Sequence, residues 1–202
     1  MLHKHIFHVP ELDLNDQQRS IIKERYYKFK EANPGVGFES VEREEGGNNP
    51  GNIATTSSDG EPVFKYITSG INLLEGVYTD KQIQQIKSLC SPLDEMNADE
   101  PFDFLETHGK VLKHIDDMRY GVITVPIIEL GHTLEFYASD DASITDDVVE
   151  TMKYDNKTYI FNPKIPHGVR TSDHMRLFWQ GSIFNKNFEQ IKQEYEQGKL
   201  FR

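Results

Sequence analysis

Disulfide bonds, long apolar runs and an excess of positive charge are all missing from this sequence. Its 202 residues include a single cysteine, Cys90, so no disulfide can form within the chain, which is typical of a reducing compartment. No apolar run approaches the roughly 18 residues of a membrane-spanning helix. The first residues also lack the long apolar segment and the small-residue cleavage site of a signal peptide. These absences predict a cytoplasmic protein without a membrane segment.

Basic residues are scarce, with 22 Lys and Arg against 33 Asp and Glu, which gives a formal net charge of -11. Duplex nucleic acid is held largely through its phosphates by Lys and Arg side chains, and a chain this acidic provides no general field for that contact. The charge balance therefore favours a small-molecule or protein substrate over nucleic acid. Nothing in the sequence indicates the oligomeric state.

The residue pattern divides the chain into three parts, which we expect to form one domain over residues 1–202. Residues 1–100 predict a region of helices and loops, within which residues 1–10 and 63–67 favour short strands. Residues 102–184 contain short β-prone runs separated by turn residues, which is typical of a sandwich or barrel of the jelly-roll kind. Residues 187–198 predict a C-terminal helix. The predicted fold is mainly β with flanking helices.

Residues 39–62 form the stretch with the fewest residues that can pack, because Glu, Gly, Asn and Ser dominate it. This composition predicts a long surface loop. Long loops often carry function, so a lid over an active site is the alternative interpretation.

What the sequence does contain is a set of metal-ligand side chains in the β-prone region. His114 and Asp116 lie two residues apart, and on an extended strand this spacing turns both side chains to the same face. Two imidazoles and one carboxylate on one face of an octahedron are the ligands of non-haem iron(II) sites that activate dioxygen. His167 is the candidate for the third ligand. Arg176, nine positions later at the beginning of a β-prone run, could hold a carboxylate through a bidentate contact.

Together these residues resemble the His-x-Asp…His…Arg signature of the 2-oxoglutarate- and iron(II)-dependent oxygenases. The resemblance covers roughly residues 102–184 and is strongest to the branches that are similar to prolyl and aspartyl hydroxylases. The surrounding segments agree with it, namely Val125-Pro126-Ile127, Tyr159-Ile160-Phe161-Asn162-Pro163 and Pro166-His167-Gly168-Val169.

The resemblance implies a double-stranded β-helix, a jelly roll shared with cupins. It implies that His114, Asp116 and His167 bind Fe(II) and form the catalytic centre. The co-substrate 2-oxoglutarate would bind the metal through its keto-acid end and Arg176 through its distal carboxylate. The expected reaction consumes O2, hydroxylates a C–H bond of a small molecule, amino acid or peptidyl residue, and releases succinate and CO2. The sequence does not identify the substrate.

A hydroxyl group often assists the arginine in this family. Thr124, Tyr159 and Ser182 are the candidates, and the sequence does not select among them.

Three alternatives stay open at this level. His132 and Glu135 are a rival ligand pair, but an offset of three residues places them on opposite faces of a regular strand. A cupin-type enzyme would use the metal without 2-oxoglutarate and would have no need of Arg176. A jelly-roll protein with a binding or structural role would have lost the metal, which an intact ligand set argues against.

Overall fold

The structure is a computed structural model that describes residues 4–32, 38–40, 64–68, 71–90, 102–107, 111–116, 119–129, 131–141, 147–170 and 175–201. Of the surface loop predicted at 39–62, residues 41–62 lie outside this set. Glu39 and Ser40, by contrast, belong to a short strand and not to a loop. No helix in the described part of the chain is long and apolar enough to cross a membrane.

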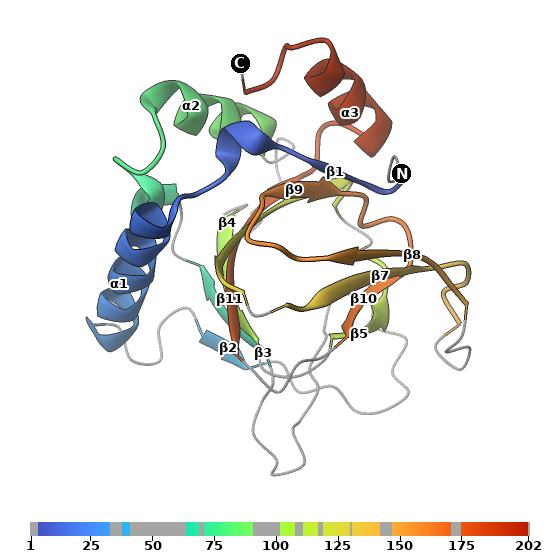
Figure 1. Cartoon of the computed structure of the whole chain (residues 1–202), viewed down its shortest axis with the longest axis horizontal. Helices are drawn as coiled ribbons and strands as arrows, with labels where there is room; N and C mark the ends of the chain where they lie inside the picture. The colour runs from blue at the N-terminus through green and yellow to red at the C-terminus, as the bar shows by residue number, and fades with distance from the viewer. Residues whose placement is uncertain are drawn as a thin grey trace.

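Two antiparallel sheets face each other and form a sandwich (Figure 1). The larger sheet has the order β1 (Ile6–His8), β9 (Tyr159–Phe161), β6 (Gly121–Ile128), β11 (Arg176–Ile183), β4 (Phe102–Thr107), β3 (Phe64–Thr68) and β2 (Phe38–Ser40). The smaller sheet has the order β5 (Val111–His114), β10 (His167–Arg170), β7 (Thr133–Tyr137) and β8 (Val148–Lys153). The predicted β-sandwich is therefore confirmed.

The larger sheet takes three of its strands from the part of the chain before residue 100. β1 pairs with β9, and β3 pairs with β4 and carries β2 on its other side. The strands predicted within residues 1–10 and 63–67 are both present, although the second is shifted by one residue. Single-domain organisation over residues 1–202 stays a prediction.

Helices cover the outer face of the larger sheet, away from the smaller one (Figure 1). They are η1 (Pro10–Leu12), α1 (Asp16–Ala32), η2 (Ile71–Leu74), α2 (Asp80–Leu89) and α3 (Phe188–Glu196). Reciprocal side-chain and backbone hydrogen bonds cap two of them, between Thr79 and Gln82 in α2 and between Asn187 and Gln190 in α3. The helix predicted at 187–198 is thus present with a defined beginning.

Alternation along β11 separates a helix-facing core from the interior of the sandwich. Leu177 and Trp179 pack in the apolar core beneath the helices. Because successive residues of a strand point to opposite faces, Arg176 and Phe178 point between the two sheets. The space between the sheets therefore receives a guanidinium group as well as apolar side chains.

A buried ion pair attaches α1 to the larger sheet. Glu106 on β4 is buried, and it accepts hydrogen bonds from the Tyr26 hydroxyl at 2.6 Å and from Lys30 Nζ at 2.8 Å. We expect Tyr26→Phe to lower the free energy of unfolding by about 1.5–3 kcal/mol, because a hydrogen bond to a buried charge is lost. Urea denaturation measures this change.

The exposed pair of Lys28 and Glu24 on the same helix is the matched control, with 2.6 Å between Nζ and Oε1. Lys28→Met should change the free energy of unfolding by less than about 1 kcal/mol. Equal stability of Tyr26→Phe and the wild-type protein would contradict the structural role of the Glu106 pair.

Candidate metal centre

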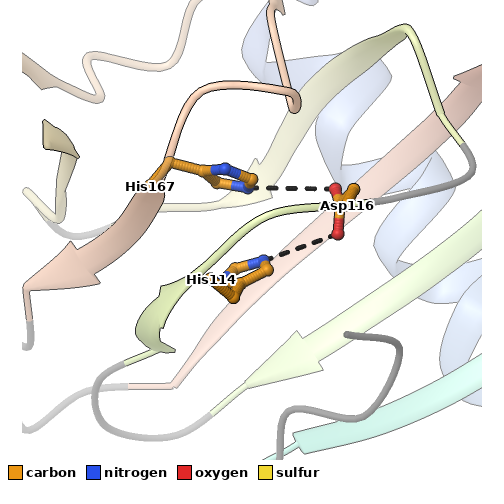
Figure 2. A group of neighbouring side chains, drawn as sticks. All are labelled: His114, Asp116 and His167. Atoms are coloured by element: carbon orange, nitrogen blue, oxygen red, sulfur yellow. Dashed lines mark ion pairs between the residues drawn. The ribbon is translucent and has the colours of Figure 1, made fainter. Parts of the chain in front are cut away.

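His114 and His167 face each other from neighbouring strands of the smaller sheet. They are directly paired in the register between β5 and β10, and their ring centroids lie 4.2 Å apart. The Asp116 carboxylate completes the group, with Oδ1 3.6 Å from His114 Nε2 and Oδ2 3.8 Å from His167 Nε2. One possible ligand atom from each residue lies within 4.8 Å of the others. Figure 2 shows both imidazoles directed at the carboxylate.

Asp116 reaches this position differently from what the two-residue spacing predicted. β5 ends at His114, so Asp116 lies beyond the strand, and the pleat alone does not align the two side chains. The backbone N–H of Asp116 instead donates to the carbonyl of Pro163 at 3.0 Å, in the segment between β9 and β10. The prediction that His114 and Asp116 lie close together is therefore right, but the extended strand on which it was based ends at His114.

Local hydrogen bonding prepares His167 to bind a metal. Its Nδ1 lies 2.9 Å from the carbonyl oxygen of Ile165, which can only accept, so the hydrogen is on Nδ1 and the lone pair is on Nε2. Burial lowers the pKa of His167, which keeps the imidazole neutral. Phe161 packs edge-on against the ring at 5.2 Å. Neutral imidazole is the form that binds metals.

Asp116 is held as a buried carboxylate anion. Burial acts to raise the pKa of its carboxyl group, but the charge of Arg119 and the two neighbouring imidazoles outweigh burial and hold this pKa below its ordinary value. Arg119 Nη2 lies 2.6 Å from Asp116 Oδ2. An ionised carboxylate beside two imidazole nitrogens is the donor set that suits non-haem iron(II). The residues present therefore fit this metal.

The same pocket contains Arg176 and the metal-ligand candidates. The pocket has about 650 Å³ of space, part of it open to solvent, and its lining includes His114, Asp116, His167 and Arg176. Burial lowers the pKa of Arg176 to about 10, although Tyr154 and Glu129 act to raise it. Arg176 is therefore cationic near neutral pH. The structure brings together all four residues that the sequence singled out.

The three hydroxyl groups that were candidates to assist Arg176 have different surroundings in the structure. The Tyr159 hydroxyl donates to Asp155 at 2.9 Å, and the Ser182 hydroxyl lies 3.4 Å from Nη1 of Arg119. Thr124 lines the pocket with Arg176 and is fully buried. Its hydroxyl lies beside Tyr154 but makes no hydrogen bond of ordinary geometry with the described residues. Thr124 is thus the best placed of the three.

Tyr154 and Arg119 are pocket residues that the sequence did not single out. Tyr154 follows β8 and lies close enough to Arg176 for the guanidinium to influence its hydroxyl. Burial raises the pKa of Tyr154 to about 12, so the hydroxyl stays protonated and can donate a hydrogen bond. No spacing rule links either residue to the signature, because Tyr154 reaches the pocket through the packing of the two sheets and Arg119 lies outside any strand.

The rival ligands have other partners. His132 is buried with Nδ1 2.8 Å from Glu129 Oε1. Glu135 instead pairs with Arg170 at 2.6 Å and accepts from the Tyr137 hydroxyl at 2.9 Å. The two side chains are therefore engaged with different residues, although His132 lies before β7 begins at Thr133 and thus outside the strand to which the parity argument applied. Among the described residues, one group of at least three His, Cys, Asp or Glu side chains lies close enough together to hold a metal ion. It consists of His114, Asp116 and His167.

Comparison with known proteins identifies the fold. No protein-family model and no curated protein matches this sequence. One similar solved structure is a non-heme α-ketoglutarate-dependent carbocyclase from nogalamycin biosynthesis, with a TM-score of 0.51 and 11% identity over 88% of this chain and 78% of that one. Another is a prolyl hydroxylase in complex with a hypoxia-inducible factor peptide fragment from Trichoplax adhaerens, with a TM-score of 0.51 and 12% identity over 89% and 84%.

At these identities the likeness concerns the fold alone. α-Ketoglutarate is another name for 2-oxoglutarate. The chain has the double-stranded β-helix fold of the 2-oxoglutarate- and iron(II)-dependent oxygenases, which confirms the fold implied by the sequence signature.

Proposed function

We propose that this protein is an Fe(II)- and 2-oxoglutarate-dependent dioxygenase. The reaction would hydroxylate a C–H bond of a small molecule, amino acid or peptidyl residue and release succinate and CO2. One observation carries the proposal: the His-Asp-His group and the buried Arg176 line a single pocket inside the fold of these oxygenases. Fold alone does not establish function, so the site has to support it.

In this proposal His114, Asp116 and His167 would hold Fe(II). When bound, the metal and 2-oxoglutarate together supply the activation of O2. The chain contributes ligand orientation through the Ile165 carbonyl and the paired strands, and it excludes water with apolar side chains such as Phe161.

We place the distal carboxylate of 2-oxoglutarate at Arg176. A buried guanidinium binds a carboxylate by charge-assisted hydrogen bonds, which are stronger than neutral ones. Thr124 lines the same pocket, Tyr154 lies close enough to interact with the guanidinium, and their hydroxyls would donate to the same carboxylate. The keto-acid end would then face the three metal ligands across the pocket.

Hydroxylation, in preference to another oxidation, rests on the sequence resemblance to the prolyl- and aspartyl-hydroxylase-like branches. The two similar structures differ in this respect, since one is named as a carbocyclase and the other as a prolyl hydroxylase. Both a small molecule and a peptidyl residue are therefore compatible with the fold. We keep a cytoplasmic location as part of the proposal.

Melting temperature distinguishes this function from its alternatives. Under anaerobic conditions Fe(II) at one hundred times its dissociation constant should stabilise the protein by about 2.7 kcal/mol, or roughly 5–10 °C for a chain of this size, and 2-oxoglutarate should increase this shift further. No shift with either ligand would contradict the proposal and favour a non-catalytic jelly roll. A shift with Fe(II) that 2-oxoglutarate does not increase would favour a cupin-type enzyme.

A further inference from the structure

We propose that Arg119 is a positioning residue of the metal centre, which holds Oδ2 of Asp116 so that Oδ1 is left to bind the metal. This inference rests on the proposed function, because it takes His114, Asp116 and His167 as the metal ligands. It assigns a role to a residue outside the His-x-Asp…His…Arg signature.

The strand β5 does not hold the Asp116 side chain. β5 ends two residues earlier, and the backbone bond to Pro163 fixes the main chain of Asp116 but leaves the carboxylate free to rotate. His114 and His167, in contrast, are fixed by direct pairing of β5 with β10. A third ligand of comparable rigidity needs a side-chain contact of its own.

Arg119 supplies that contact. In the described part of the chain, the hydrogen bond to the Asp116 carboxylate comes from Arg119 Nη2, at 2.6 Å. Arg119 is itself restrained, since its side chain is 18% exposed and Nη1 lies 3.4 Å from the Ser182 hydroxyl. The neighbouring N–H of Tyr120 donates to the carbonyl of Ile183 at 2.8 Å and attaches the chain just before β6 to the end of β11.

The two carboxylate oxygens therefore have different neighbours. Oδ2 accepts the hydrogen bond of the guanidinium and also lies 3.8 Å from His167 Nε2, whereas Oδ1 faces His114 Nε2 at 3.6 Å without a contact to Arg119 closer than that of Oδ2. A carboxylate held in this way offers the metal one oxygen, which is what a site with two imidazoles and three open positions requires. Hydrogen-bonded partners of metal ligands orient them in the same manner in other sites.

A positioning role and a purely electrostatic role predict opposite results. A guanidinium near the site repels a divalent cation, so removing its charge alone would tighten metal binding. Removing the hydrogen bond that orients Asp116 would weaken it. The sign of the change in metal affinity therefore decides between the two roles.

The test is a titration with Co(II), without 2-oxoglutarate, of the wild-type protein, Arg119→Met and Arg119→Lys. We expect Arg119→Met to bind Co(II) about 10- to 100-fold more weakly. Arg119→Lys should recover part of the loss, because an ammonium can donate to Oδ2 but lacks the fork of a guanidinium. Arg170→Met is the matched control: Arg170 lies on β10 with His167 and pairs with Glu135 at the same 2.6 Å. Its Co(II) affinity should equal that of the wild-type protein.

Each outcome has a defined meaning. Wild-type protein that binds no Co(II) would overturn the proposed function and this assignment with it. If the wild-type protein binds Co(II), equal or tighter binding by Arg119→Met would overturn the assignment alone. Should Arg119→Met fail to fold, as judged by its melting curve, Arg119→Lys decides the question. Wild-type affinity and an unchanged visible spectrum of bound Co(II) in that variant would show that the orientation of Asp116 does not need the guanidinium, which would overturn the assignment.

Discussion

His167→Ala is expected to bind Fe(II) or Co(II) more than about 100-fold more weakly than the wild-type protein, and to lose turnover. The change removes a ligand outright, so the loss should exceed the roughly 10- to 100-fold effect of removing a partner of a ligand. His114 and Asp116 would remain, but two ligands from adjacent elements cannot occupy three positions of an octahedron. Equilibrium dialysis measures the affinity.

The fold of this variant should be retained, because β10 pairs with β5 and β7 through backbone atoms. His132→Ala is the matched control, since His132 is also a buried histidine but pairs with Glu129. It should change stability without changing metal affinity. Metal binding by His167→Ala at wild-type strength would show that His167 is not a ligand.

Arg176→Ala is expected to raise the KM for 2-oxoglutarate by roughly 30-fold to several-thousand-fold while metal affinity stays within a few-fold of wild type. The range corresponds to about 2–5 kcal/mol for truncating one partner of a buried charge pair. Arg176 lines the pocket and is 2% exposed, so solvent would not replace the lost contact. Initial rates of succinate release at varied 2-oxoglutarate concentration measure the effect.

Two further variants show which features of the pocket bind the 2-oxoglutarate carboxylate. Thr124→Val should raise the same KM by roughly 10- to 150-fold, because a hydrogen bond from a hydroxyl to a buried carboxylate is lost at a side chain of similar shape. Arg176→Lys retains the charge without the bidentate geometry and should lie between the alanine variant and the wild-type protein. Normal 2-oxoglutarate dependence in Arg176→Ala would mean that the carboxylate binds elsewhere in the pocket.

Local spacing predicted the parts of the structure that depend on neighbours in the chain. The β-prone run that begins at Arg176 is the strand β11, and the helix predicted at 187–198 is α3 with its N-cap at Asn187. The sequence also predicted the metal-ligand candidates, because His and Asp side chains are recognisable as ligands from their residue types and from the His-x-Asp spacing. The structure places these candidates within reach of one metal ion.

Features that arise from long-range contacts were not predictable in the same way. Ser40 is in a strand because β2 pairs with β3, and nothing in the composition of residues 39–62 indicates that partner. Tyr154 reaches Arg176 only after the two sheets pack together. Arg119 is three residues from Asp116 and lies outside any strand, so no periodicity directs its side chain. Asp116 itself depends on Pro163, which is remote in sequence.

Formation of succinate from 2-oxoglutarate tests the central claim most directly. The protein would be incubated with 2-oxoglutarate, with and without Fe(II) and O2, in a metabolite extract that supplies candidate substrates, and compared with His167→Ala. We expect succinate to form only with the wild-type protein and only when both Fe(II) and O2 are present. Absence of succinate from metal-loaded wild-type protein, or equal formation by His167→Ala, would contradict the assignment of this pocket as a 2-oxoglutarate-dependent dioxygenase site.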